Sequence, residues 1–512
     1  MSEFLPPDAM TLQAAGQALS RSLEAYERGV QETDRTFYDT FDGLLHQAGL
    51  SVVHESGRLI ALEQSSGEEL ASLASAQPIE PLFANQLDPG PLRDVLAPIV
   101  EQRALLPLAH VHCRARGFGI LDGHLKTVVR AMLEEPMLVE PSSSTVPLRP
   151  RLRVAAVPGY DHALARVQHT LEHELGFRAA DQLLVDEAVR AAGGIPGGIS
   201  AKVEVPLSFE QRSDAAAAAV LSRLREVIEA NLPGAIAALD SEFLHDLRVS
   251  VRRSRTVQRQ LKSVFAPVDL AGFRSEFQWL QQATGEARDL DVHVLEFDAL
   301  RRLVPKAMRA HLDPLLEVLR ERRALAHAEM VGALRSARTE HLLADWELLL
   351  SELVELPDGD RPGASRPIGE LAGERIAKVY RRIVKMGSSI EPDSPAERYH
   401  ELRKAGKELR YLLELFAVPL YPSEVVEPAV KALKGIQHVL GRHQDREVQI
   451  ATLRSLAEPV SALPGGPRAL MAMGVIVERL GEDERAARHE FGRRFDAFAS
   501  KAQRRQIKGT FL

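Results

Sequence analysis

The chain has 512 residues, of which 45% are hydrophobic and 26% are charged, and its formal net charge is −7. These values are typical of a globular protein with two or three domains, each able to bury a core of its own. They exclude a generally basic protein that attracts nucleic acid over its whole surface, and no apolar run is long enough to predict a membrane span.

The first residues, "MSEFLPPDAM", lack the basic start and apolar core of a secretory signal, and Cys113 is the single cysteine. A lone cysteine forms no intramolecular disulfide, so we expect a protein of the reducing cytoplasm. The charge is unevenly spread, since residues 1–150 contain 11 Arg and Lys against 20 Asp and Glu, a balance of −9. Any binding of an anionic partner must therefore come from local basic patches.

The N-terminal part of the chain is predicted to be α+β. Residues 1–33 resemble a polar helical segment, and residues 34–208 contain short alternating segments divided by Gly, Pro and Ser. Alternation predicts strands, and helical spacing predicts helices. The expected strands are 51–64, 109–121, 126–135, 151–157 and 199–207, and the expected helices are 160–177 and 179–194. The glycine-rich stretch 193–200 lacks the Lys-Ser/Thr of a phosphate-binding loop and is predicted to be a flexible turn.

From residue 212 to 500 nearly every segment has helical period, which predicts an all-α domain after a boundary at 208–212. This part also repeats itself. "HDLRVSVRRSR" from His245 matches "HELRKAGKELR" from His400, and "GEARDLDV" from Gly285 matches "GRHQDREV" from Gly441, at offsets of 155 and 156 residues. We interpret the pattern as a duplicated helical unit whose copies pack about a pseudo-two-fold axis.

Basic residues recur in these helices at steps of three and four, which place them on one face. The first stripe contains His245, Arg248, Arg252, Arg255, Arg259 and Lys262; the second contains His400, Arg403, Lys407 and Arg410, with Lys404 beside them; the third contains Arg375, Lys378, Arg382 and Lys385.

Like charges at this spacing repel one another. A run of charge is usually a solvated face or one neutralised by acidic neighbours, but Asp and Glu are nearly absent from the first stripe. A long polyanion would relieve the repulsion along a whole stripe, because Arg offers forked donors to phosphate oxygens and Lys a mobile charge. The two histidines could donate to phosphate as well.

The same residues carry a family resemblance. "LDSEFLHDLRVSVRRSR" with "ARDLDV", and "ERYHELRKAGKELRYLLELF" with "LGRHQDREV", resemble the CHAD family, the conserved histidine α-helical domain. The resemblance implies two pseudo-symmetric four-helix bundles, binding of inorganic polyphosphate on a basic central surface, and targeting to polyphosphate granules. The positions that match the motif are His245, Arg248, Arg252, Arg255, His400, Arg403, Lys407 and Arg410. Spacing adds Arg253, Arg259, Lys262, Arg288, Lys404 and the stripe from Arg375 to Lys385.

The N-terminal part resembles a second family. "DRTFYDTFDGLLHQAGLSVVHE" (34–55) is similar to a segment of CYTH domains, the triphosphate tunnel metalloenzymes, and "RLRVAAVPGYDHALARV" (151–167) to segments of CYTH–CHAD fusions. That family implies a strand-lined basic tunnel and an E-x-E-x-K motif for metal and triphosphate, which this sequence lacks. We therefore expect a degenerate, catalytically silent CYTH-like domain. The alternative is a triphosphatase or polyphosphatase that acts through this domain.

We expect no metal site and no cofactor. "HTLEH", with His169, Glu172 and His173, is better explained as a solvated helix face, and Cys113 alternates along a strand with His110 and His112, on the opposite face. The expected protein is thus a cytoplasmic, non-catalytic binder of polyphosphate. We do not expect a nucleic-acid partner, because no aromatic residues interleave with the stripes for base stacking. The oligomeric state is not predicted.

Overall fold

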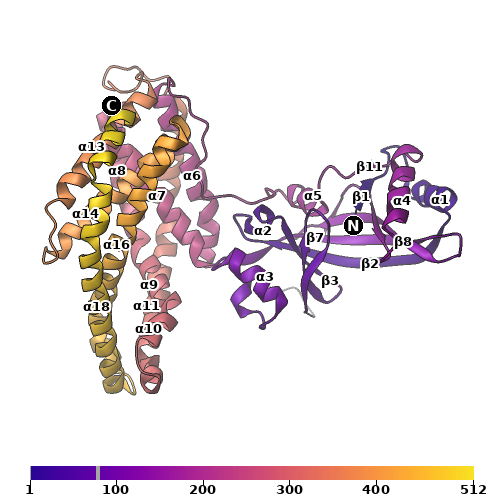
Figure 1. The fold of residues 1–512 in the computed structure, drawn as a ribbon, viewed down its shortest axis with the longest axis horizontal. Helices are drawn as coiled ribbons and strands as arrows, with labels where there is room; N and C mark the ends of the chain where they lie inside the picture. Colours follow the sequence, from indigo (N-terminus) through magenta and orange to yellow (C-terminus); the bar gives the residue numbers. More distant parts are fainter. Residues whose placement is uncertain (1, 76–80, 512) are drawn as a thin grey trace. The chain divides into compact units, whose positions relative to one another are not determined.

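The computed structural model describes residues 2–75 and 81–511, and the chain divides into two compact units, Met1–Ser200 and Ala201–Leu512 (Figure 1). The first unit is built on one antiparallel sheet in the order β11–β1–β10–β8–β7–β2–β3–β4–β5, with β6 pairing β7 and β9 pairing β8. The strands are β1 (Ser2–Leu5), β2 (Ala25–Asp39), β3 (Leu50–Glu55), β4 (Arg58–Glu63), β5 (Glu69–Ala74), β6 (Leu82–Phe83), β7 (Ala104–Leu121), β8 (Thr127–Val139), β9 (Thr145–Pro147), β10 (Arg151–Ala156) and β11 (Arg178–Ala179).

Helices cover the sheet where alternate strand residues are apolar. Val129, Ala131 and Leu133 of β8 are buried in the same core cluster as Val167 and Leu171 of α4, as the two-residue period of a strand requires. The helices of this unit are α1 (Leu12–Ser22), α2 (Leu44–Gln47), α3 (Pro91–Val100), α4 (Asp161–His173) and α5 (Leu184–Ala191). The strands expected near 109, 126 and 151 and both expected helices are confirmed, as is the α+β class. The single strand expected over 51–64 is instead a hairpin of β3 and β4.

Two expectations for this unit are wrong. Residues 1–33 are not a helical segment, since they contain β1, α1 and the beginning of β2. The short β1 is stabilised by β10 and β11 on its two sides, and β2 by β7, so partners distant in sequence override a polar local pattern. The segment 199–207 is not a strand, because it finds no neighbouring strand within the part of the chain that the structure describes.

The second unit is helical. Its helices are α6 (Ser213–Ala237), α7 (Ser241–Gln260), α8 (Pro267–Ala283), α9 (Gly285–Leu295), α10 (Phe297–Arg302), α11 (Asp313–Leu334), α12 (Ala337–Glu352), α13 (Ile368–Gly387), α14 (Ala396–Leu412), α15 (Val418–Leu420), α16 (Ser423–Ser455), α17 (Ala457–Ser461), α18 (Gly466–Phe498) and α19 (Lys501–Phe511). Over residues 2–75 and 81–511, no helix combines the length and the apolar character that a membrane span requires.

The predicted duplication is visible in the order of the long helices. The pairs α6/α13, α7/α14, α8/α16 and α11/α18 begin 155, 155, 156 and 153 residues apart, so each copy contributes four long helical rods. In the first copy the third rod is broken at Thr284 into α8 and α9, whereas α16 is continuous. The rods α14, α16 and α18 pack successively side by side, and α7 of the first copy contacts α14 of the second (Figure 1).

The units meet earlier in the sequence than the predicted boundary at 208–212, and the helical unit continues past residue 500. Residues 202–206 lie against Arg253 and Arg410, and Arg253 Nη1 donates to the carbonyl oxygen of Ala201 (3.1 Å), so this segment belongs to the helical unit. At the other end, Ile507 and Phe511 of α19 are buried. The start and the end of the helical unit are therefore set by packing contacts and not by the change from alternating to helical sequence pattern.

Candidate functional site

The first copy presents its basic face on α7. The helix begins at Asp240, whose carboxylate accepts hydrogen bonds from the backbone N–H groups of Glu242 (2.8 Å) and Phe243 (3.2 Å), an N-cap that fixes its start. Leu247 and Val251 bury the opposite face. Because the apolar face of α7 packs into the core, Arg252, Arg255 and Arg259 lie on the side of the helix that faces α8 and α14.

A cavity of about 880 Å³ lies between α7, α8 and α14. Seven cationic side chains line it and Glu408 is the single carboxylate among its described lining residues; the cations are Arg252, Arg255, Arg259, Arg274, Arg338, Lys404 and Lys407. Because Arg252, Arg255 and Arg259 come from the first stripe and Lys404 and Lys407 from the second, the structure brings parts of both stripes to one cavity.

Four of these cations form no ion pair among the described residues: Arg252, Arg255, Arg274 and Lys407. Arg255 donates to the side-chain oxygen of Gln281, and burial, followed by repulsion from Arg259 and Arg274, lowers its pKa. Arg252 makes no ion pair there, and its Nε is buried without a hydrogen-bond acceptor.

Lys407 is the most perturbed member of the cavity. Partial burial, followed by repulsion from Arg403 and Arg252, lowers the pKa of its ammonium group to about 7. Desolvation and like charge both disfavour the protonated amine, so this is a place where an anion would be strongly stabilised.

The remaining cavity cations are partly neutralised. Buried Glu408 accepts from Arg259 Nε (3.0 Å) and also bonds Gln260 and Arg382. Lys404 pairs with exposed Glu401 on its own helix. These bonds hold α7, α13 and α14 together at the cavity wall, and they reduce the positive charge without abolishing it.

Arg248 belongs to the first stripe but lies outside the cavity lining. Its Nη1 donates to the carbonyl oxygen of Gln281 and to Thr284 Oγ1, both at 2.8 Å, and burial lowers its pKa to about 10. Arg248 therefore braces the break between α8 and α9.

The two predicted histidines also lie outside the cavity lining. His245 Nδ1 is 3.1 Å from Arg288, which donates to the carbonyl oxygen of Ser241 and pairs with Glu242. His400 Nδ1 bonds the side-chain oxygen of Gln444. Both histidines thus connect their helix to a neighbouring one.

The other predicted residues are distributed around the helical unit. Arg253 and Arg410 both pair with Glu414, at 3.0 and 2.5 Å, and line a separate pocket. Arg403 pairs with Asp445 (3.3 Å), and Arg382 reaches the cavity wall through Glu408. Outside the cavity lining are also Lys262, in a 3₁₀ turn, and Arg375, Lys378 and Lys385 of α13.

Sequence reasoning missed Arg274, Arg338 and Trp279. Arg338 pairs with Glu276 (2.6 Å) and stacks over the Trp279 ring, 4.1 Å from its centroid. Arg274 and Arg338 belong to none of the basic stripes and so give no periodic signal; the packing of α8 against α12 brings them to the cavity.

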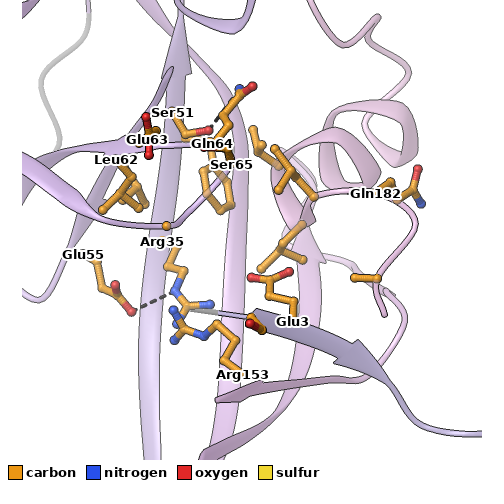
Figure 2. Close-up of a pocket in the computed structure, with 18 of the residues that line it drawn as sticks. Glu3, Arg35, Ser51, Glu55, Leu62, Glu63, Gln64, Ser65, Arg153 and Gln182 are labelled. Carbon is orange, nitrogen blue, oxygen red and sulfur yellow. Dashed lines mark hydrogen bonds and ion pairs between the residues drawn. The ribbon is translucent and has the colours of Figure 1, made fainter. Parts of the chain in front are cut away.

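The N-terminal unit contains a pocket of about 460 Å³ in the sheet (Figure 2). Its two cations, Arg35 and Arg153, both pair with fully buried Glu134, and Arg35 Nε also pairs with Glu55 (2.8 Å). Burial raises the pKa of Glu134, but Arg153 and Arg35 outweigh it and hold that pKa below its ordinary value. The lining also includes Glu3, Glu63 and Asp181, so acidic side chains outnumber basic ones.

The described residues include no group of three or more His, Cys, Asp or Glu side chains arranged to hold a metal ion. His169 and His173 of α4 stack with ring centroids 4.2 Å apart, and His173 Nδ1 lies 3.1 Å from the carbonyl oxygen of His169.

Comparison with known proteins follows the same division of the chain. The family model for the CHAD domain matches residues 219–454. The crystal structure of the CHAD domain from the plant Ricinus communis is 25% identical, covers 56% of this chain and 96% of its own, and superposes with a TM-score of 0.45. PptA from Streptomyces chartreusis is 20% identical, with coverages of 56% and 100% and a TM-score of 0.44. A search of curated proteins found no match.

The match spans α7, α9, α14 and most of α16, the helices that carry the duplicated motifs. The unit before it is β-rich, and its antiparallel sheet is consistent with a CYTH-like domain. Residues 219–454, within the helical unit, therefore match a CHAD domain.

Proposed function

We propose that this protein binds inorganic polyphosphate in the cavity between α7, α8 and α14 and does not catalyse its conversion. The observation that carries the proposal is that parts of the first and second stripes meet at one cavity, in which Arg252, Arg255, Arg274 and Lys407 form no ion pair among the described residues. Each internal phosphate of the polymer carries a negative charge, so a chain threading this cavity would pair with several cations at once. Hydrogen bonds to charged groups contribute about 1.5–3 kcal/mol each when well placed.

The direct test compares two double variants with the same change in charge. Arg252→Gln/Lys407→Gln removes two cavity cations, whereas Arg320→Gln/Lys306→Gln removes two exposed cations outside the cavity lining. Calorimetry with long-chain polyphosphate should show affinity lowered by roughly 100-fold or more in the first variant and by less than about threefold in the second. Equal losses would mean that general charge, and not the cavity, binds the polymer.

Two further measurements separate this function from its alternatives. Screening shortens from a length of about 10 Å at 0.1 M salt to about 3 Å at 1 M, so binding should weaken steeply with salt. Competition with RNA of equal phosphate content should leave polyphosphate bound, because the Trp279 face that Arg338 covers is closed to stacking bases. Displacement by RNA would support a nucleic-acid binder instead.

The alternative function is hydrolysis of triphosphate or polyphosphate by the N-terminal unit. The pocket in its sheet argues against this activity, since Arg35 and Arg153 are already paired with carboxylates and acidic residues predominate. We expect no orthophosphate release from tripolyphosphate with Mg²⁺ or Mn²⁺. Release that is lost in Arg35→Gln or Arg153→Gln would restore the enzyme hypothesis.

The polymer also suggests where the protein acts. A cytoplasmic protein with this site should collect on polyphosphate granules, and a fluorescent fusion should co-localise with them. The Arg252→Gln/Lys407→Gln variant should stay diffuse, while the Arg320→Gln/Lys306→Gln variant should still co-localise.

A further inference from the structure

Lys407 lies in an unusual charge environment. On its own helix it is surrounded by Arg403, Lys404 and Arg410, and on α7 by Arg252, which repels it, and by Arg255 and Arg259, which line the same cavity. Other titratable groups that line the cavity or act on Lys407 are Arg274 of α8, Asp445 of α16, and Glu408 and Tyr411 of α14 itself. Arg382 of α13 and Glu414 of the π-helical turn 413–417 bond to residues of α14.

Each neighbouring carboxylate is already engaged by another cation. Glu408 forms ion pairs with Arg259 and Arg382, and Asp445 forms one with Arg403. Glu414 forms ion pairs with Arg253 and Arg410. Lys407 therefore lines the cavity without an ion pair of its own among the described residues, although Asp445 attracts it from beyond ion-pair distance. Partial burial penalises its ammonium form, and the surrounding guanidinium groups add repulsion, so both effects favour the neutral amine.

A polyanion in the cavity would favour the protonated form of the Lys407 amine over the neutral form. Phosphate oxygens beside Nζ would replace repulsion by attraction and would accept hydrogen bonds that only the protonated amine can fully supply. Resting on the proposed function, we propose that Lys407 takes up a proton when polyphosphate enters the cavity, so that the affinity of this site is linked to pH. The reaction is a protonation of the amine by solvent or buffer, and no covalent bond to phosphorus forms.

The direction of the linkage follows from thermodynamic reciprocity. Since the free amine has a pKa of about 7 and the bound one a higher pKa, the ligand prefers the protonated protein. Affinity should be nearly constant below pH 6 and should fall by up to about tenfold for each pH unit above 7. Proton uptake should therefore be small at pH 6, rise through pH 7 and approach one proton per site at pH 8.

The experiment is calorimetry of the full chain with long-chain polyphosphate in HEPES and in Tris, whose ionisation enthalpies differ. The difference in heat between the buffers gives the number of protons taken up. Lys407→Arg is the matched variant, because a guanidinium stays protonated throughout this range. Its uptake should drop by close to one proton at pH 8, and its affinity should depend less on pH than that of the wild type. Titration of the polymer's terminal phosphates is common to both proteins and cancels.

The outcomes separate the inference from the proposed function. If the wild type and Lys407→Arg bind with the same uptake at pH 8, the inference is wrong while polyphosphate binding stands. If no polyphosphate binds at any pH, the proposed function itself fails. A second variant, Lys407→Gln, tests the inference if arginine does not fit the site. The Lys407→Gln protein should bind polyphosphate more weakly than the wild type and should lack the wild-type proton uptake at pH 8. Proton uptake equal to that of the wild type in this variant would also overturn the inference.

Discussion

At the scale of single residues, Glu408 sets the charge of the cavity. It is 3% exposed and bonds Arg259, Gln260 and Arg382, so it withdraws two guanidinium groups from any ligand. A buried carboxylate of this kind contributes to stability through its partners, because removing it leaves their charges unpaired. Glu408 thus stabilises the cavity wall and weakens the attraction of that wall for anions.

Replacing Glu408 by Gln should therefore separate stability from binding. We expect polyphosphate affinity to rise by about 3–10-fold, since Arg259 and Arg382 become available, and the free energy of unfolding to fall by about 1–3 kcal/mol. Calorimetry and urea unfolding measure the two effects. Glu321→Gln, which removes an exposed carboxylate on α11, is the control and should alter neither quantity appreciably. Unchanged or weaker binding by the Glu408 variant would contradict this role.

The residue pattern of the sequence predicts part of the cavity. Steps of three and four place Arg252, Arg255 and Arg259 on one face of α7, and all three line it. The same steps include Arg248, which is buried against Gln281 and Thr284. Helical spacing identifies a shared face, but it does not say where along that face a neighbouring helix begins to cover it.

At the scale of elements, Arg248 joins α7 to the break between α8 and α9. Arg248→Met should lower the free energy of unfolding by about 2–4 kcal/mol, because the Gln281 carbonyl oxygen and Thr284 Oγ1 lose the charged donor that Arg248 supplies. The polyphosphate affinity of the folded Arg248→Met protein should change by less than about threefold. Arg255→Met should instead lower polyphosphate affinity and leave the free energy of unfolding nearly unchanged. Urea unfolding and calorimetry on both variants check this, and a large loss of affinity in Arg248→Met would place Arg248 in the binding site.

Buried histidines connect helices and should make the helical unit sensitive to acid. Burial lowers the pKa of His293, whose Nε2 is 3.2 Å from Thr452 Oγ1, and burial, partly opposed by Glu484, lowers that of His443. A depressed imidazole pKa means that the native state holds the neutral form, so protonation favours unfolding. Stability should be complete above about pH 6.5 and should fall below it, by at most about 1.4 kcal/mol per pH unit for each histidine.

Tryptophan fluorescence can follow this transition selectively, since Trp279 and Trp346 both lie in the helical unit. Between pH 7.5 and 5.5, His293→Gln should lose less stability than the wild type in urea unfolding. An identical loss in the two proteins would show that His293 is not part of the acid response.

Helices and strands were predicted correctly from the sequence where the local residue pattern agrees with the burial of that segment in the folded protein. The helix repeat at an offset of about 155 residues appears in both sequence and structure, because each copy buries a similar apolar face. The break at Thr284 is absent from the second copy. In the first copy Thr284 accepts a hydrogen bond from Arg248 of α7, a contact between helices that the local pattern does not predict. Likewise, β1 exists because β10 and β11 flank it.

At the scale of the whole molecule, the two units divide the charge. The acidic balance of residues 1–150 belongs to the sheet unit, whose pocket cations Arg35 and Arg153 are paired. The cavity cations Arg252, Arg255, Arg274 and Lys407, which form no ion pair among the described residues, lie in the CHAD domain. All the residues that line the cavity come from Ala201–Leu512. Binding should therefore be a property of that unit by itself.

Expression of residues 201–512, with the 202–206 segment retained, should give a folded protein that binds polyphosphate within about threefold of the full chain. Residues 1–200 should bind neither polyphosphate nor tripolyphosphate, because Glu134 already engages Arg35 and Arg153. Calorimetry on the two fragments and the full chain measures this directly. A loss of tenfold or more in the helical fragment, with its helical circular dichroism intact, would mean that the sheet unit supplies part of the site. Binding by residues 1–200 would mean that their own cations can exchange Glu134 for phosphate.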